Sequence, residues 1–339
     1  MSGCRAMIPM AETAHKGNDM RKIATVSISI FILLLAGLYG YVWVNKVPDK
    51  TVVELSSRWA QPPSQFIPVG GLNVHFRDEG PQNDHLPIVL LHGTSASLHT
   101  WDGWTKELKR THRVIRFDLP AFGLTGPSPI NDYSIESYVG FVIAVLNELG
   151  VEQFVLGGNS LGGYIAWATA VIHPARVSNL ILVDASGYPS SADSAPLAFT
   201  IAQTPVINTL LQGFMPRSLI ETSVKNVFGN PALVTDELVD RYLELNSRAG
   251  NRQALVERFK QTQPGNMATR VKEISADTLI MWGAKDKLIP AIPSAERFNR
   301  EIKNSTLVIF DELGHVPHEE NPELTVARVK EFLSRVKTP

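Results

Sequence analysis

The sequence predicts an α/β fold in which a mostly parallel β-sheet carries helices on both faces, contains a helical cap as an insertion and follows one amino-terminal transmembrane helix. Three observations predict this fold. From residue 66 onward, short apolar runs alternate with helical stretches; residues 186–275 replace that alternation with helix-like sequence; and residues 23–44 form an uncharged apolar run. The predicted order is a tail (1–22), a transmembrane helix (23–44), a linker (45–65), the first part of the core (66–185), the cap (186–275) and the second part of the core (276–339).

Composition and charge exclude several classes of protein. A content of 44% hydrophobic and 19% charged residues excludes a disordered chain, and a net charge of −1 with both signs interspersed argues against nucleic-acid binding. The single cysteine, Cys4, precedes the apolar run, so the body contains no disulfide, cysteine–metal cluster or cysteine nucleophile. The phosphate-binding motifs GxxxxGK[S/T] and GxGxxG are absent from the sequence.

Residues 23–44 are long enough to cross a bilayer. As a helix at ~1.5 Å per residue they span ~33 Å, against ~30 Å for the hydrocarbon core. Tyr39, Tyr41 and Trp43 near the far end suit the headgroup level, and Lys46 follows them. A cleaved signal peptide is the alternative, but it typically has an apolar stretch of only about 7–15 residues and a small-residue cleavage site. We therefore expect an uncleaved anchor and a single-pass membrane protein.

The sequence predicts the orientation of this helix in the membrane less strongly than it predicts the helix itself. Basic residues at 21–22 abut its amino end, and Lys46 and Lys50 follow its carboxyl end. The positive-inside rule favours an amino terminus in the cytoplasm, while the side on which the body lies stays open. Met20 directly precedes the basic pair and is an alternative start to Met1.

Residues 45–65 predict a short surface helix with a tether or, equally, a plain linker. Two strand-like runs follow, 66–69 and 72–77, around a Gly70-Gly71 pair that suits a hairpin turn. The sheet is therefore expected to begin with an antiparallel pair. Because the apolar run lies wholly before these strands, we expect the body from about Ser64 onward to fold and react without it.

The rest of the body alternates between strands and helices. The predicted strands are continuous apolar runs, as expected when both faces of a strand are buried: 88–91, 114–117, 154–156, 180–183, 278–282 and 307–310. Apolar residues at helical spacing predict helices at 134–149, 161–172 and from 321 onward, with Ser134 and Pro322 at helix starts. In the cap we expect helices at 205–214, 216–227, 235–245 and 253–261.

Residues 158–162, Gly-Asn-Ser-Leu-Gly, fit the pattern Gly-x-Ser-x-Gly. The pattern alone is weak, since it occurs by chance in roughly one chain in ten of this length. Here a predicted strand runs into Ser160 and a predicted helix follows it, which is the strand–turn–helix context of a nucleophile elbow. Small residues flank Ser160 because a tight turn leaves no space for side chains. An inert serine in a Gly-rich turn is the alternative.

From residue 66 to the carboxyl end, the chain resembles the α/β-hydrolases that carry a helical cap. In that family a His-Gly pair follows the third strand, and His92, Gly93 and Thr94 directly follow residues 88–91. The resemblance implies an oxyanion hole made by the backbone N–H groups of Thr94 and Leu161, with His92 and Gly93 as structural residues of the loop.

The run that starts at Asp118 resembles the family's turn after the fourth strand. Ala121 and Thr125 stand where the family usually has Gly and Ser, a departure that concerns the geometry of the turn. The resemblance implies that Asp118 organises this loop and takes no part in catalysis.

A serine nucleophile needs a base, and the base needs an acid to orient it. Among nine histidines, His315 follows the predicted last strand, and residues 314–322 resemble the family's catalytic-histidine loop. We expect His318, three residues on, to lie at the rim or in solvent. Asp286 follows the penultimate strand, where the family carries its acid, and Asp184 after the preceding strand is the rival. The resulting order Ser160, Asp286, His315 is that of the family.

The resemblance implies a serine hydrolase that cleaves carboxylic esters and needs no metal or cofactor. A serine rather than an aspartate as the nucleophile disfavours dehalogenase and epoxide-hydrolase chemistry. The anchor suggests a lipid-like acyl substrate, in resemblance to membrane-bound monoacylglycerol lipases. Apolar cap residues could line the pocket or form the cap's own core: Phe214, Met215, Val224, Val227 and Phe228.

Two alternatives stay open. The first is a carbon–carbon bond hydrolase of the meta-cleavage-product type, because the run Gly-Asn-Ser-x-Gly-Gly occurs in that branch. It would need a basic pocket residue for the substrate's carboxylate, which the sequence does not identify. The second is a non-catalytic homologue that binds a small ligand, against which an intact triad argues. The sequence does not specify an oligomeric state.

Overall fold

The computed structural model describes residues 11–44, 46–189, 215–263 and 265–335, with side chains from Ile23 onward. It divides into two compact units, Met1–Lys46 and Val47–Pro339. The first unit contains α1 (Ala11–Val44). Within α1, Ile23–Val44 is long and apolar enough to cross a membrane, by length and composition. The helix begins earlier than the predicted span because the polar residues before Ile23 continue it.

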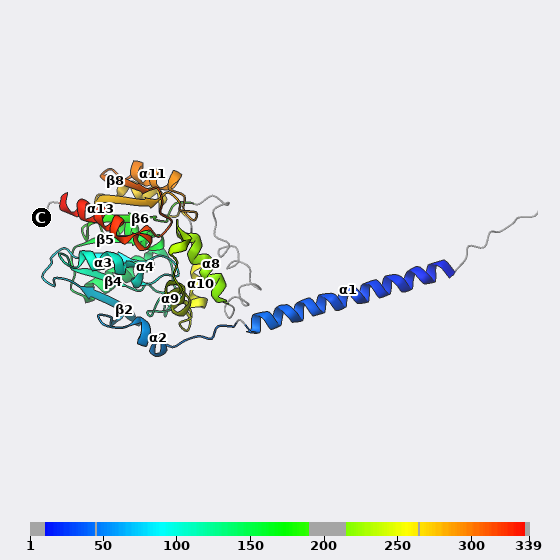
Figure 1. The fold of residues 1–339 in the computed structure, drawn as a ribbon. Helices are drawn as coiled ribbons and strands as arrows, with labels where there is room; N and C mark the ends of the chain where they lie inside the picture. The colour runs from blue at the N-terminus through cyan, green and yellow to red at the C-terminus, as the bar shows by residue number, and fades with distance from the viewer. Residues whose placement is uncertain (1–10, 45, 190–214, 264, 336–339) are drawn as a thin grey trace, which may run out of the picture. The chain divides into compact units, whose positions relative to one another are not determined.

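The second unit, hereafter the body, is built on one eight-stranded sheet in the order β1-β2-β4-β3-β5-β6-β7-β8 (Figure 1). Its strands are β1 (Gln65–Val69), β2 (Leu72–Glu79), β3 (Ile88–Leu91), β4 (Val114–Phe117), β5 (Phe154–Asn159), β6 (Val177–Val183), β7 (Asp277–Gly283) and β8 (Ser305–Phe310). The β1–β2 and β2–β4 pairs are antiparallel, and all the other pairs are parallel. The predicted α/β fold with an antiparallel start is confirmed.

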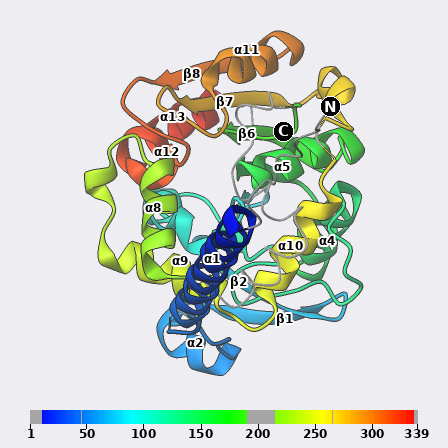
Figure 2. The ribbon, with the colours of Figure 1, turned by 90° about the vertical axis from the view of Figure 1, so that its right-hand side faces the viewer.

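The described helices of the body surround this sheet (Figures 1 and 2). They are α2 (Val52–Trp59), α3 (Asp102–Leu108), α4 (Ile135–Glu148), α5 (Leu161–Ile172), α8 (Arg217–Val227), α9 (Asp236–Asn246), α10 (Asn251–Gln261), α11 (Ala291–Glu301), α12 (Pro317–Glu320) and α13 (Pro322–Arg335), with short 3₁₀ turns at Leu98–Trp101, Pro231–Leu233 and Ala268–Glu273. Helices α8, α9 and α10 agree with three predicted cap helices, and the fourth, at 205–214, lies outside the described residues.

Each face of the sheet has its own core because successive side chains of a strand point to opposite faces. Along β3, Ile88 and Leu90 belong to one buried cluster, and Val89 and Leu91 belong to the other. The first cluster is closed by residues of α3 and α13, and the second by residues of α4, α5 and α11. The parallel strands are therefore fixed from both sides, and their carboxyl ends form a rigid base for loops.

Residues 49–60 are part of the body. Helix α2 begins with a capping box between Thr51 and Glu54, and it packs buried Leu55 and Trp59 against Leu245 of the cap. Two backbone bonds join the preceding residue Lys50 to the turn after α9: its N–H donates to Ser247 O and its carbonyl accepts from Ala249, both at 2.8 Å. Of the two alternatives for residues 45–65, the surface helix is confirmed: α2 buries one face and exposes the other. A body cut at Ser64 would lose these contacts.

Candidate active site

Ser160 occupies a sharp turn between β5 and α5. Its backbone has φ 54° and ψ −114°, an unfavourable conformation for a residue with a side chain. A Cβ at Gly158 would lie 2.2 Å from Gly162 O, and one at Gly162 would lie 2.2 Å from Leu91 O. Backbone contact on both sides therefore requires glycine at these positions, and the turn presents Ser160 at the carboxyl end of the sheet.

Asn159, the residue before Ser160, ties this turn to the histidine loop. Its buried Nδ2 donates to His315 O at 2.9 Å and to Val183 O at 3.1 Å. The carboxamide thus fixes the backbone of His315 beside the serine turn, and the ends of β5 and β6 to each other. The local sequence does not reveal this role of Asn159, because the partner of its amide lies 156 residues away.

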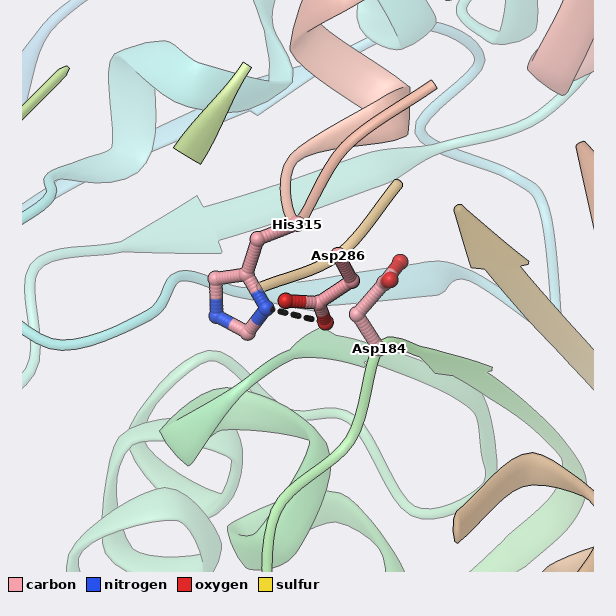
Figure 3. A group of neighbouring side chains, drawn as sticks. All are labelled: Asp184, Asp286 and His315. Atoms are coloured by element: carbon pink, nitrogen blue, oxygen red, sulfur yellow. Dashed lines mark hydrogen bonds and ion pairs between the residues drawn. The ribbon is translucent and has the colours of Figure 1, made fainter. Parts of the chain in front are cut away.

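His315 and Asp286 form a buried pair. His315 Nδ1 lies 2.7 Å from Asp286 Oδ2, and both residues are 5% exposed (Figure 3). The other oxygen of Asp286 accepts the backbone N–H groups of Leu288 at 2.8 Å and Ile289 at 3.0 Å. Because a carboxylate only accepts hydrogen bonds, His315 Nδ1 is the donor, and in the neutral ring Nε2 is left as an acceptor. That is the tautomer a general base requires.

Asp184, the rival acid, lies beside this pair without contacting the imidazole as Asp286 does. It directly follows β6, is fully buried, and its Oδ1 accepts the N–H of Gly283 at 3.0 Å. One side-chain atom from each of Asp184, Asp286 and His315 lies within 4.8 Å of the others. Ligands of one tetrahedral zinc ion would lie about 3.3 Å apart. The 2.7 Å between His315 Nδ1 and Asp286 Oδ2 is the distance of a hydrogen bond and is shorter than the spacing of two zinc ligands. The cluster therefore fits a group of hydrogen-bonded side chains better than a metal site.

The loop after β3 passes close to Ser160. A Cβ at Gly93 would lie 3.2 Å from Ser160 Cβ, so the backbone that leads to Thr94 borders the serine. His92 is buried; its Nδ1 donates to Gly93 O at 2.8 Å and its Nε2 accepts the N–H of Leu119 at 2.9 Å. Burial lowers the pKa of His92, and this bonding pattern fits the neutral ring. Among the described residues, neither the Thr94 N–H nor the Leu161 N–H has a hydrogen-bond acceptor.

Asp118 connects the three segments that carry His75, Leu98 and Leu124. Its carboxylate accepts the backbone N–H groups of Leu98 and Leu124, both at 2.8 Å, and lies 2.7 Å from His75 Nδ1. Burial alone would raise the pKa of Asp118, but the charge and hydrogen bond of His75 outweigh burial and lower it. Ala121, which replaces the family's glycine, has φ 81°, so this turn keeps its shape at a cost in backbone strain.

The expectation that His318 lies at the rim or in solvent is wrong. Its side chain is fully buried, stacks on Trp101 with ring centroids 4.0 Å apart, and its Nε2 lies 3.0 Å from Thr100 Oγ1. Burial, followed by the charges of His315 and Arg241, keeps the pKa of His318 well below its usual value. The helix α12 that carries it turns inward, which the sequence spacing did not reveal.

Two acidic residues after His318 hold the cap on the histidine loop. Glu319 forms a partly buried ion pair with Arg241 of α9. Glu320 accepts three backbone N–H groups: Gly314 at 2.8 Å, Gly229 at 2.9 Å and Asn230 at 2.7 Å. Glu320 lies inside the run that resembles the histidine loop, yet its partners in the cap are visible only in the structure.

Cap residues also pack directly on this loop. The carbonyl of Val227 accepts the N–H of His315 at 2.7 Å, and Val224 and Phe228 form a buried cluster with Val316. These apolar residues therefore belong to the packing between the cap and the core, whereas Phe214 lies outside the described residues. The histidine loop is positioned from the cap side as well as from the sheet side.

Comparisons with known proteins agree with this architecture. The sequence profile described as "alpha/beta hydrolase fold" matches residues 87–322. A 2-hydroxy-6-oxo-2,4-heptadienoate hydrolase of Pseudomonas putida is 29% identical over 280 residues, 80% of this chain and 96% of the relative. A solved meta-cleavage product hydrolase of Pseudomonas fluorescens has a TM-score of 0.69 at 25% identity and covers 80% of this chain and 98% of its own. A bacterial membrane phospholipase A has a TM-score of 0.69 at 24% identity and covers 92% of this chain and 98% of its own.

Proposed function

This chain belongs to the α/β-hydrolase fold family, and from that premise we propose that it is a membrane-anchored serine hydrolase that cleaves carboxylic esters through an acyl-enzyme. One observation carries the proposal. His315 Nδ1 donates to buried Asp286 at 2.7 Å, on a loop that Asn159 bonds to the strained turn of Ser160. A base in the right tautomer and a nucleophile on a sharp turn are the two parts that acyl transfer needs.

The proposed reaction has two halves. In the first, His315 Nε2 takes the proton of Ser160 Oγ while Oγ attacks the ester carbonyl, and the N–H groups of Thr94 and Leu161 stabilise the oxyanion. The tetrahedral intermediate then collapses; the alkoxide leaves with the proton from His315, and the acyl group stays on Ser160. In the second, His315 removes a proton from water, the resulting hydroxide attacks the acyl carbonyl, and Ser160 regains its proton as the acid leaves.

A carbon–carbon bond hydrolase is the second candidate, because one similar solved structure is a meta-cleavage product hydrolase and one relative is a 2-hydroxy-6-oxo-2,4-heptadienoate hydrolase. Such substrates carry a carboxylate that needs a cation. The partly buried guanidinium of Arg241, which neighbours the histidine loop, is already neutralised by Glu319. Arg258 of α10 is buried near Tyr138 of α4, with no carboxylate partner and an unpaired Nη1 among the described residues. Because Arg241 is paired with Glu319, its guanidinium is not free to bind a substrate carboxylate. The pairing therefore favours a substrate that carries no charge near Arg241, such as an ester.

The membrane assignment has its own support. The span Ile23–Val44 fits a bilayer by length and composition. The body from Val47 makes up about 86% of the chain, so the 92% covered by the membrane phospholipase A extends into the residues before it. That likeness is one of fold. The span Ile23–Val44 and the aromatic and basic residues at 39–46 support an anchored enzyme, and an anchor favours a substrate that partitions into lipid.

The experiment that tests this function is a substrate panel on the purified full chain in detergent. The panel contains p-nitrophenyl esters of graded chain length and a dienoic 1,5-diketone acid whose loss is followed by its absorbance. We expect hydrolysis of the esters, abolished in Ser160→Ala, and little turnover of the diketone acid. Turnover of the diketone acid alone would instead establish the carbon–carbon reaction.

A further inference from the structure

Asp184 is a buried acid that the proposed mechanism does not use. Its side chain has no exposed surface, and its backbone has φ 44°, held by an N–H that donates to Met281 O at 3.0 Å. Oδ1 accepts the N–H of Gly283 at 3.0 Å. Oδ2 is buried and has no hydrogen-bond partner among the described residues. A buried carboxyl oxygen with an unmet hydrogen bond is costly unless it carries a proton that finds an acceptor.

The candidate acceptor is Asp286. Atoms of the two carboxyl groups and of His315 lie within 4.8 Å of one another, and Asp286 lies between the other two (Figure 3). Asp286 accepts three hydrogen bonds, from two backbone N–H groups and the imidazole, whereas Asp184 accepts one. Two buried carboxyl groups this close do not both ionise, so the charge stays where the donors are and the proton goes to the other group.

We propose that Asp184 is a positioning residue of the triad: it holds a proton on Oδ2 and donates a hydrogen bond to the carboxylate of Asp286. The inference rests on the proposed function, in which Asp286 orients His315. The added donor fixes Asp286 from the side opposite the imidazole and spreads its negative charge. The acid of the triad is thereby a carboxylate supported by a neutral carboxylic acid.

The electrostatics of the neighbourhood agree with a neutral Asp184. Burial, then the charge of Asp286, raises the pKa of Asp184 well above its usual value, and the proposed hydrogen bond to Asp286 and the charge of Glu320 act in the same direction. The Gly283 N–H acts in the opposite direction. His315 itself faces Asp286 and the buried, uncharged ring of His318. Within the part of the chain that the structure describes, no cation is among the groups that act most strongly on Asp184.

Two substitutions of similar size separate a proton donor from a space-filling side chain. In Asp184→Asn, Oδ1 can still accept from Gly283 while Nδ2 donates to Asp286, so the neutral acid is reproduced. Asp184→Leu removes both bonds. We expect Asp184→Asn to keep kcat/KM for a p-nitrophenyl ester within about threefold and to leave the acid limb of its pH profile in place. In Asp184→Leu the more concentrated charge on Asp286 should lower kcat by about tenfold and move the acid limb up by about 0.5–1 pH unit.

Other outcomes would overturn the proposal. If Asp184 is ionised, Asp184→Asn removes a charge near His315 and moves the acid limb to lower pH. If the two variants behave alike, the side chain only fills space. Should Asp184→Leu fail to fold, infrared spectra of the wild type and Asp184→Asn at pH 7 decide: a protonated carboxylic acid band that Asp184→Asn lacks supports the proposal, and its absence from the wild type overturns it. The infrared result needs no substrate, so it stays valid if the wild type hydrolyses no ester and the proposed function fails.

Discussion

Glu320→Gln tests how the cap positions the catalytic histidine. In the structure Glu320 Oε2 accepts the N–H groups of Gly314 and Gly229, and Oε1 accepts the N–H of Asn230, at distances of 2.7–2.9 Å. The side chain is 8% exposed, so water does not replace these bonds. Glutamine has one carbonyl oxygen, which can keep two of the three bonds, and its NH₂ group must then face the remaining N–H.

The cost follows from this geometry. A hydrogen bond to a charged group contributes about 1.5–3 kcal/mol, and an N–H left buried without a partner costs a similar amount. We expect Glu320→Gln to lower the free energy of unfolding by about 2–3 kcal/mol, which corresponds to about 3–5 °C in Tm for a body of this size. Because Gly314 precedes His315, the loop should also shift, and kcat should fall about tenfold or more.

Urea unfolding followed by tryptophan fluorescence measures the stability, and hydrolysis of a water-soluble p-nitrophenyl ester measures kcat and KM. Glu323→Gln is the matched control, since Glu323 is exposed at the start of α13 and has no hydrogen-bond partner among the described residues. The control should match the wild type in both assays. A Glu320→Gln variant that also matches the wild type would refute the role assigned to these three bonds.

Three further predictions follow from the site and the body. Asp286→Asn should reduce turnover by several powers of ten with the fold intact, and Asp184→Asn by far less; the reverse order of the two rates would make Asp184 the acid. A chain that starts at Val47 should keep the Tm of the body, whereas one that starts at Ser64 lacks α2 and should melt at least about 5 °C lower by calorimetry; equal values would show that α2 is dispensable. Burial lowers the pKa of His99 in the folded protein to about 3. In the unfolded chain the same imidazole has an ordinary pKa of about 6.5, so below that pH the unfolded chain binds more protons and the free energy of unfolding falls as the pH falls. His99→Gln should therefore reduce the loss of unfolding free energy between pH 7 and 5.5 by about 1 kcal/mol, and an unchanged loss would mean that His99 is not buried as a neutral ring.

The strands and the three candidate triad residues could be predicted because their signals are local. A strand buried on both faces is a continuous apolar run, as in β3 and β5, and the residues that follow such strands meet at one edge of the sheet. Ser160 directly follows β5, and Asp286 and His315 lie in the loops that follow β7 and β8. Glycines at 158 and 162 marked the serine turn because no other residue fits between the backbones.

The features that could not be predicted depend on contacts between distant segments. Asn159 and Glu320 bond to backbone groups 156 and about 90 residues away, and nothing in their local sequence indicates those partners. The burial of His318 could not be predicted, because its spacing from His315 gives no information about the direction of α12. The state of Asp184 depends on a neighbouring acid that reaches it through the tertiary fold, from 102 positions further along the chain.

The central claim is that Ser160 forms an acyl-enzyme with His315 and Asp286 as its base and acid. The most direct measurement is the labelling of the full-length protein with a fluorophosphonate, followed by mass spectrometry of its peptides. We expect one phosphonyl adduct, on Ser160, which disappears in Ser160→Ala and forms much more slowly in His315→Ala. Labelling that persists in Ser160→Ala, or a folded wild type that takes up no label, would contradict the assignment.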